Sequence, residues 1–277
     1  MARGQDSAGT ADAGRTLAGR LAAAGVSDRS EPWEAWLRLR AAEGNRATII
    51  DLYELAAARQ GVAAHELPAA TRLGLARRAM ARTWPGFAVA EGSERPAEPL
   101  VVVDHDPAWS RAYECWRQRL AAALGATALR IEHVGSTSVP GLVAKPIVDI
   151  QVSVADPGDE AGYVPALRAI GLVLRSRDDL HRFFRPPAGQ PHGVHVHVCA
   201  AGGQWEHDHL LFRDYLRAHP AAARRYAAVK RAAVRRWSDD SWAYTDAKSV
   251  VVLDLLDQAE AWAAAASEAV RRSSDLP

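Results

Sequence analysis

The spacing of apolar residues divides the chain into a helical first part and a mixed second part. Between about residues 16 and 83 apolar residues recur at intervals of three and four, as in the stretch from Ile50 to Leu55. This spacing is typical of amphipathic helices, which often end at a glycine. Glycines interrupt the pattern at three places (Gly25, Gly44 and Gly61). We therefore predict three or four helices in this region.

The second part interleaves short apolar or alternating segments with longer helical patterns. Strands are predicted at 99–103, 129–134, 145–155, 172–176, 181–187 and 194–200. Helices are predicted at 108–125 and 164–172, at 204–237 with a break at Pro220, and at 241–270. Strands mixed with helices in this way favour an α+β fold with a mixed sheet flanked by helices.

The two patterns meet at residues 85–99, which combine proline, glycine and charge without periodicity. Such a stretch predicts a linker, or a short strand followed by one. We accordingly expect a disordered tail at 1–11, a helical domain with its linker at 12–95, and an α+β domain at 96–277.

Charge and cysteine content narrow the functional classes. Lys and Arg number 34 against 33 Asp and Glu, a net charge of +1, so the whole molecule offers no steering toward nucleic acid or an anionic membrane. The two cysteines, Cys115 and Cys199, are too few for a disulfide framework. The sequence has no run of about 18 apolar residues and its start lacks the apolar core of a signal peptide. We expect a cytoplasmic protein that does not enter a membrane.

The candidate chemistry begins with a glycine–serine pair and a lone aspartate. Gly135 and Ser136 follow a predicted strand, and Asp149 lies in the next one. Backbone N–H groups of such a turn, at the start of a short helix, can hold a phosphate, and the carboxylate can bind a divalent metal. An alternative interpretation is a plain turn glycine, a helix cap and a hydrogen-bonded strand aspartate.

The sequence around this turn resembles a known family. RIEHVGSTSVPGLVAKPIVDI is similar to the signature of the GrpB family, and the likeness continues through DHDPAW, HRFF, HVHV, WEHDHLLFRDYLRAHP and AYTDAK. It covers roughly residues 100–265 and leaves the helical first hundred residues outside. The resemblance implies the nucleotidyltransferase fold of polymerase beta. Enzymes with this fold transfer a nucleotidyl group from a nucleoside triphosphate to an acceptor.

The superfamily pattern transfers to particular residues. It implies that Gly135 and Ser136, with Thr137 and Ser138, grip the nucleotide, and that Asp149 is the first metal-binding carboxylate and a catalytic residue. The second carboxylate position holds Gln151, an uncharged and weaker metal ligand. The expected cofactor is Mg²⁺ or Mn²⁺ and the expected co-substrate is ATP, with an unidentified small molecule as acceptor.

Histidines offer a further ligand. Alternation in the strand at 194–200 places His195, His197 and Cys199 on one face, which is either a site face or a solvated one. We predict His197 as a catalytic residue and metal ligand, and His195 as a substrate contact. Imidazoles at such a place suit a metal more transition-like than magnesium, or donate to phosphate.

Other polar residues extend the prediction. Lys145 and Lys248 are candidates for the triphosphate, and His133, Arg213 and Tyr244 for substrate. Three of them have an ordinary structural alternative. Lys145 could be a helix-end cation, His133 a strand histidine satisfied by backbone bonds, and Arg213 part of an ion pair on a solvated helix face.

Three functions fit these residues. The first is a metal-dependent nucleotidyltransferase that also has the means to activate a carboxylate for ligation. The second is a catalytically silent nucleotide-binding module that acts through a partner. A phosphoesterase that uses His195 and His197 is the third. The candidate roles of the helical domain are acceptor selection, partner recruitment and homodimer formation. Its sequence lacks the basic patch of a nucleic-acid-binding domain.

Overall fold

The computed structural model describes residues 16–27, 30–84, 86–92 and 99–274, so the predicted tail at 1–11 lies outside it. Contacts group the chain into two compact units, one formed by Met1–Ala79 with Asp240–Val250 and the other by Met80–Asp239 with Val251–Pro277. This grouping differs from a division at residue 96, because residues 80–92 join the sheet unit and residues 240–250 return to the helical one.

The first unit is helical, as the spacing predicts. It contains α2 (Leu17–Ala23), α3 (Pro32–Glu43), α4 (Ile49–Ala58), most of α5 (Ala69–Thr83), α10 (Ser241–Asp246) and the single turns η1 (Gly44–Arg46) and η2 (Ala64–Glu66). Its core is made of fully buried side chains, among them Trp36, Leu39, Leu52 and Tyr53. Thr48 begins α4 with a capping box, in which its hydroxyl accepts from Asp51 N and Asp51 accepts from Thr48 N.

Residues 240–250 belong to this unit because two aspartates anchor them. Asp240 caps α10 and forms a buried ion pair with Arg72, with 3.1 Å between Nε and Oδ2. Asp246 accepts from the backbone N–H of Ile50 at 3.2 Å. These bonds hold α10 as a short separate helix, so the prediction of a single helix at 241–270 is wrong. It is interrupted after Asp246, and α11 (Ser249–Ser274) follows.

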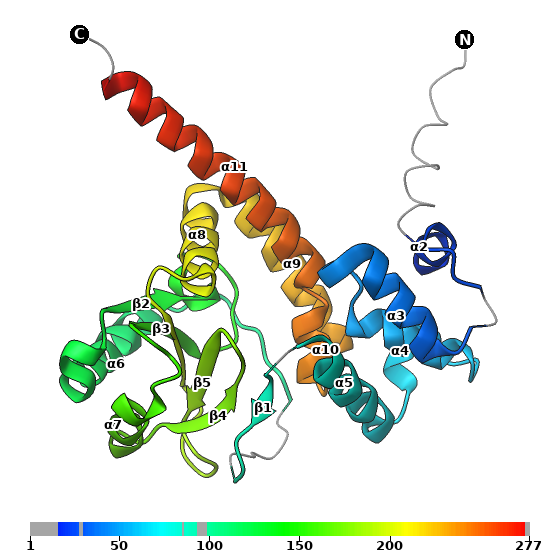
Figure 1. Ribbon diagram of the computed structural model, residues 1–277, viewed down its shortest axis with the longest axis horizontal. Helices are drawn as coiled ribbons and strands as arrows, with labels where there is room; N and C mark the ends of the chain where they lie inside the picture. The colour runs from blue at the N-terminus through cyan, green and yellow to red at the C-terminus, as the bar shows by residue number, and fades with distance from the viewer. Residues whose placement is uncertain (1–15, 28–29, 85, 93–98, 275–277) are drawn as a thin grey trace. The chain divides into compact units, whose positions relative to one another are not determined.

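The second unit is built on a six-stranded sheet. Its strands are β1 (Ala88–Val89), β2 (Arg130–Val134), β3 (Val148–Val154), β4 (Val173–Arg177), β5 (His181–Arg185) and β6 (Val194–Ala200). The order is β1-β4-β5-β6-β3-β2, with β3 and β6 parallel and every other pair antiparallel (Figure 1). The sheet is therefore mixed and flanked by helices, which confirms the predicted α+β class.

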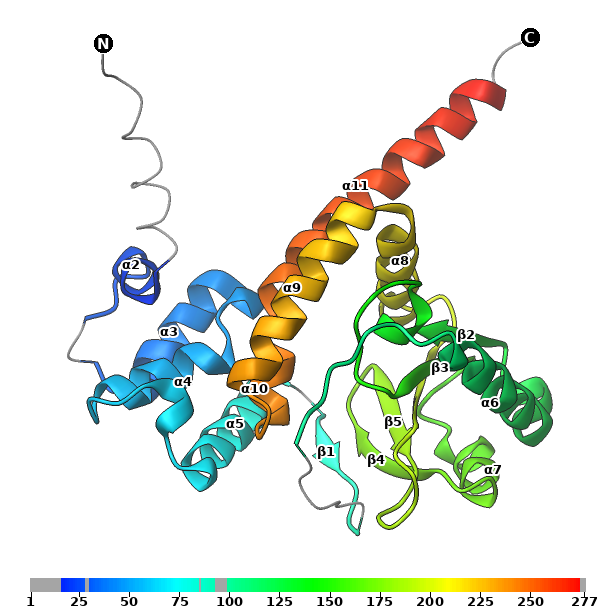
Figure 2. The same cartoon turned by 180° about the vertical axis from the view of Figure 1, so that it is seen from behind.

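The two faces of this sheet differ in chemistry. Helices α6 (Ala108–Leu124) and α7 (Val164–Ala169) lie on one face, against the buried side chains of Ile150, Phe184 and Val196 (Figure 2). Helix α8 (Gln204–Ala218) lies against the other face, where Ser153 donates to Glu206. That face carries the alternate residues of β3 and β6, which are polar.

A second core joins the helices of the same unit. Helix α8 packs with α9 (Pro220–Arg236), with the first part of α11 and with the segment 139–143. Buried side chains from each meet there, including Val139, Leu142, Leu211, Tyr215, Tyr226 and Leu255. Pro220 begins α9 two residues after α8 ends, as predicted, since proline suits a first helical turn. Single turns η3 (Gly125–Thr127), η4 (Ser136–Ser138) and η5 (Glu160–Gly162) complete the unit.

One predicted strand does not form. Residues 99–103 make a single bridge, between Val103 and Ala144, and the N–H of Leu100 instead donates to Ser238 O at 2.7 Å. Val102 of this segment packs on the second core. The apolar character of the segment therefore serves side-chain packing, and the segment does not pair as a strand.

Candidate functional site

A carboxylate and two imidazoles meet on the polar face of the sheet, on the two adjacent inner strands β3 and β6. Strand register places Asp149 of β3 opposite His195 of β6 and Gln151 opposite His197. Asp149 Oδ1 lies 3.1 Å from His195 Nδ1 and 3.6 Å from His197 Nε2. One ligand atom from each of the three residues lies within 4.8 Å of the other two, which suits a metal ion. We call these residues the Asp–His cluster.

Charge and burial set the protonation of the cluster. Burial acts to raise the pKa of Asp149, but hydrogen bonds and charge from His195 and His197 hold it well below its usual range. Burial lowers the pKa of His197, against the opposing effect of Asp149. The carboxylate is thus ionised and still 30 % exposed, so it is open to a solvent-borne cation.

The glycine–serine turn borders Asp149 directly. Val134, the last residue of β2, pairs with Asp149, and Gly135 follows it with φ of +66°. A Cβ atom at Gly135 would lie 2.6 Å from Asp149 Oδ2. Glycine is therefore required twice, for the left-handed backbone and for the close approach of the carboxylate.

The element after this turn is shorter than expected. Ser136, Thr137 and Ser138 form only the single 3₁₀ turn η4, where a short helix was predicted. The reason is local: the next residues, Val139 and Leu142, leave the helical path to join the second core. One turn has little helix dipole, so any anion here must be held by individual N–H groups, hydroxyls and cations.

The polar groups of the turn hold it in place. Ser138 Oγ donates to Gly135 O at 2.6 Å, and Thr137 Oγ1 lies 3.0 Å from His133 Nε2. His133 is buried and stacked on Tyr113, and burial lowers its pKa to about 4. Arg217 of α8 donates twice to Ser138 O, at 2.8 and 3.0 Å. Among the predicted residues, His133, Thr137 and Ser138 thus act in shaping the turn.

Helix α9 adds two residues that the sequence did not indicate. The Tyr226 side chain is hydrogen-bonded to Ser136, and burial raises the pKa of Tyr226 to about 12. One turn further, buried Lys230 donates to Val143 O, and its ammonium lies 5.4 Å from the Tyr226 ring centroid. Burial lowers the pKa of Lys230 to about 7, with Asp149 opposing the shift. The i, i+4 spacing of Tyr226 and Lys230 was a signal, but on a helix it is also typical of core packing.

Lys145 resembles Lys230 in its surroundings. Burial lowers the pKa of Lys145, and the charge of Asp149 opposes the change. Both lysines therefore interact electrostatically with the carboxylate of Asp149. Where protonated, they add positive charge near Asp149, which suits a phosphate group.

Other predicted residues are engaged elsewhere. Gln151 is fully buried, and its amide lies 3.5 Å from Ser153 Oγ. Arg213 donates to Glu132, to Asp214 and to His133 O. Lys248 and Tyr244 belong to the helical unit, where the Lys248 ammonium lies 3.9 Å from the centroid of the Tyr244 ring. The predicted roles of Gln151 in metal binding, of Arg213 and Tyr244 in substrate binding and of Lys248 in nucleotide binding stay predictions.

Aromatic rings surround the cluster's histidines. His197 stacks on Phe183 at 5.1 Å and on Trp205 at 5.3 Å between ring centroids, and Trp205 stacks on His209 at 3.6 Å. His192, which precedes β6 and was not predicted, places Nε2 2.8 Å from His195 Nε2. These contacts fix the ring planes of both cluster histidines.

In the part of the chain that the structure describes, no helix has the length and apolarity to span a bilayer.

Fold and site together define an α+β protein with a candidate metal centre on one face of a mixed sheet. The chain belongs to the GrpB family, whose model, described as GrpB protein, matches residues 99–258. A UPF0157 protein of Streptomyces coelicolor is 47 % identical over 158 residues, which cover 57 % of this chain and 83 % of that protein.

A solved structure has the same fold. The crystal structure of conserved protein GrpB from Enterococcus faecalis has a TM-score of 0.52 and 29 % identity, and it covers 58 % of this chain and 99 % of its own. The family resemblance is thus confirmed.

A further relative has a different name. A protein named dephospho-CoA kinase in Mycobacterium leprae is 34 % identical over 195 residues, which cover 60 % of this chain and 47 % of that protein.

Proposed function

We propose that this protein is a metal-dependent nucleotidyltransferase of the polymerase-beta type that uses ATP or another nucleoside triphosphate and a small acceptor. The observation that carries the proposal is the direct approach of Asp149 to the Gly135 turn, which leaves no room for a Cβ atom. A metal-binding carboxylate beside a turn that can present backbone N–H groups is what a transferred phosphoryl group requires.

The residues present fit a divalent metal. Asp149, His195 and His197 would hold it, since their ligand atoms already lie within 4.8 Å of one another. When bound, such an ion neutralises charge on phosphate oxygens and polarises the phosphorus centre.

The chain's own groups would orient the triphosphate. The turn would offer the N–H groups of Ser136 and Thr137, and Lys145 and Lys230, where protonated, would offer positive charge near Asp149. Tyr226 holds Ser136 in position through its hydrogen bond. With both lysines largely withdrawn from water, their attraction for phosphate is stronger than at an exposed surface.

The comparison with a mycobacterial dephospho-CoA kinase gives limited support. That name denotes a protein that handles nucleotide phosphates, and the match spans 47 % of it. The likeness supports a link to nucleotide chemistry and carries no kinase activity to this chain.

A catalytically silent nucleotide-binding module is the second candidate, and Gln151 is the observation that favours it. Gln151 stands where the superfamily has its second carboxylate, and it is fully buried. A site with one carboxylate has less charge to hold two ions, so binding can persist where transfer has been lost.

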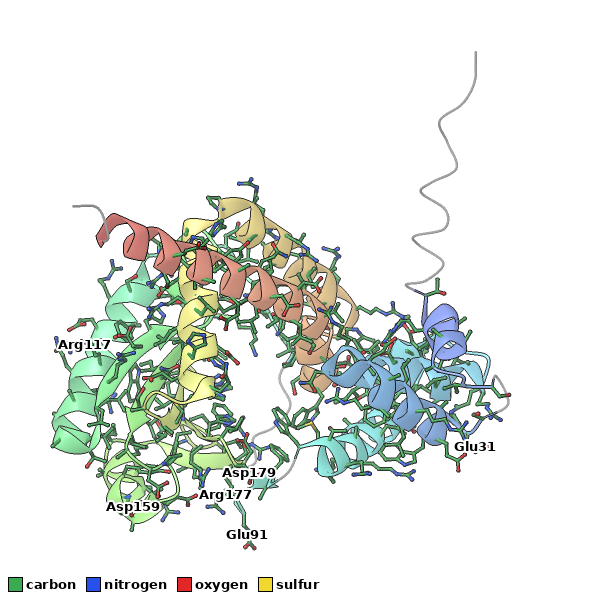
Figure 3. The ribbon with its side chains drawn as sticks, turned by 45° about the horizontal axis from the view of Figure 1, so that its top comes forward. Glu31, Glu91, Arg117, Asp159, Arg177 and Asp179 are labelled. Atoms are coloured by element: carbon green, nitrogen blue, oxygen red, sulfur yellow. The ribbon has the colours of Figure 1, made fainter. Side chains whose placement is uncertain are left out.

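One experiment tests both. The full chain is titrated with ATP, GTP, CTP and UTP, with and without divalent metal, and each mixture is assayed for pyrophosphate release. Metal-dependent binding with pyrophosphate release, both lost in Asp149→Ala, is the expected result. Asp159→Asn, an exposed carboxylate labelled in Figure 3, is the matched control and should behave as wild type.

The outcomes separate the candidates. Binding that survives without any pyrophosphate release supports the silent module. If no nucleotide binds in the presence of any metal, both candidates are wrong.

A further inference from the structure

The ligand set of the Asp–His cluster points to the kind of metal. It offers one carboxylate oxygen and two imidazole nitrogens, from Asp149, His195 and His197. Mg²⁺ prefers oxygen ligands in near-ideal octahedral geometry, whereas imidazole suits zinc, copper, iron and nickel. The donor atoms therefore favour a transition metal over the magnesium expected from the superfamily.

The separations of two pairs of ligand atoms are close to those around such an ion. Zinc binds histidine nitrogen and carboxylate oxygen at 2.0–2.2 Å, so neighbouring ligands of a tetrahedral site lie roughly 3.3–3.6 Å apart. The cluster shows 3.1 Å from Asp149 Oδ1 to His195 Nδ1 and 3.6 Å to His197 Nε2. The side chains are 14–30 % exposed, so an ion has a path to them and a coordination position remains for water or substrate.

His192 provides the support that a metal-binding histidine needs. If His195 binds the ion through Nδ1, its Nε2–H must find an acceptor, and His192 Nε2 lies 2.8 Å away. Metal-binding histidines commonly donate their second N–H in this way, which fixes tautomer and ring orientation.

Gln151 stands in the corresponding relation to His197. His197 Nδ1 and Gln151 Oε1 are both buried without a hydrogen-bond partner among the described residues. The two residues pair across β3 and β6, with side chains on the same face. When His197 binds through Nε2, its Nδ1–H needs an acceptor. Gln151 Oε1 would supply one after a side-chain rotation, because the two atoms are not hydrogen-bonded in this structure.

We infer that Asp149, His195 and His197 form a site for a divalent transition metal of the zinc class, with His192 and Gln151 as positioning residues. This rests on the metal site of the proposed function and deepens it by naming the ion's class. It also gives Gln151 a role outside the ligand set that the superfamily pattern assigns to it.

The test is metal binding by the full-length chain without nucleotide. Zn²⁺, Co²⁺ and Mg²⁺ are titrated separately by calorimetry, and visible absorption of bound Co²⁺ reports its coordination. One Zn²⁺ or Co²⁺ per chain should bind at least about 100-fold more tightly than Mg²⁺. Asp149→Asn, His195→Ala and His197→Ala should each abolish this binding or weaken it more than about 10-fold.

A surface group requires its own control. His207, Asp208 and Glu260 also place possible ligand atoms within 4.8 Å of one another, but His207 and Glu260 are half exposed. His207→Gln should leave the high-affinity site and its Co²⁺ spectrum unchanged. Zn²⁺ binding that is lost in His207→Gln and kept in Asp149→Asn would overturn the inference, as would equal affinity for Mg²⁺ and Zn²⁺.

The positioning residues have separate readouts. His192→Phe should weaken Zn²⁺ binding about 10-fold and shift the Co²⁺ spectrum, and His192→Gln, whose amide oxygen still accepts, should restore most of both. Gln151→Met keeps the volume, removes the acceptor and should also shift the spectrum. Spectra and affinities that are unchanged in His192→Phe and Gln151→Met would contradict the positioning roles. Thermal unfolding of each metal-free variant identifies any that fails to fold, and Asp149→Asn, which keeps the side-chain shape, then carries the test.

Failure of this inference is distinguishable from failure of the proposed function. Tight Zn²⁺ binding without pyrophosphate release from any nucleotide supports the metal site and overturns the transferase. Mg²⁺-dependent pyrophosphate release with no Zn²⁺ site does the reverse.

Discussion

The two faces of strands β3 and β6 differ in polarity: one is apolar and packs in the core, and the other carries the polar groups of the candidate site. On one face Val148, Ile150 and Val152 are almost fully buried beneath α6 and α7. On the other, Asp149, Gln151 and Ser153 face α8 and the histidines of β6. The apolar face supplies hydrophobic stability, and it holds the strand register that brings Asp149 beside His195. Polar groups can therefore be concentrated on one face because the other provides the packing.

The largest expected effect breaks the apolar face. Ile150→Ala should lower the free energy of unfolding by about 2–5 kcal/mol, because it removes a fully buried side chain and leaves a cavity. Chemical denaturation measures the change. Leu129→Ala, at a position that is 60 % exposed, is the control and should change stability by no more than about 0.5 kcal/mol. An equal loss in both variants would contradict this view of the core.

A second prediction concerns acid stability and the turn beside the site. The pKa of His133 is about 4 in the fold, and an unfolded histidine has one near 6.5. Between these values the unfolded chain holds a proton that the fold lacks, so stability falls as pH drops from 6.5 to 4. The shift corresponds to about 3 kcal/mol as an upper limit.

Denaturation at several pH values tests it. The loss on acidification should be smaller in His133→Gln than in wild type. His209, whose pKa burial also lowers to about 4, keeps its own contribution in both proteins. An NMR titration that gives His133 a pKa near 6.5 would contradict the prediction.

The third prediction separates backbone strain from crowding at Asp149. Gly135→Ala should cost about 1–3 kcal/mol and weaken Zn²⁺ binding, since the backbone is left-handed and the new Cβ would meet the carboxylate. Gly141→Ala is a matched control because Gly141 has φ of +77° with nothing within 4 Å of its Cβ position. Calorimetry should find Zn²⁺ affinity lowered only in Gly135→Ala, and an equal loss in both would assign the effect to strain alone.

The smallest expected effect sharpens the electrostatics of the polar face. Lys230→Met should weaken pyrophosphate binding about 10-fold, about 1.4 kcal/mol, if Lys230 contributes charge at Asp149. In the wild type, affinity should fall as pH rises from 6 to 8, because the ammonium, with a pKa of about 7, is lost in that range. Lys248→Met is the comparison, and a larger effect there would favour the triphosphate contact predicted from sequence.

Periodicity predicted most of the sheet unit because its signal is local. The alternation of VHVHVCA gave β6, and β2, β3 and α6 lie close to their expected bounds. Three predictions failed where tertiary contacts replaced local preference. The short helix predicted after Gly135 is the single turn η4, because Val139 and Leu142 join the second core. Residues 99–103 pack on a core and form only one bridge, and the anchors of Asp240 and Asp246 interrupt the last helix.

The sequence by itself determined the α+β class, the family, and a glycine–serine turn followed by a strand aspartate. The sequence also predicted, through the family resemblance, that Asp149 and His197 share a metal site, and only the tertiary structure decided which other polar groups lie beside them. Strand register joined Asp149 to His195 and His197, α9 brought in Tyr226 and Lys230, and Tyr244 with Lys248 went to the helical unit. The physical reason is that periodicity reports which face a residue occupies, whereas proximity between elements depends on long-range packing that no local pattern contains.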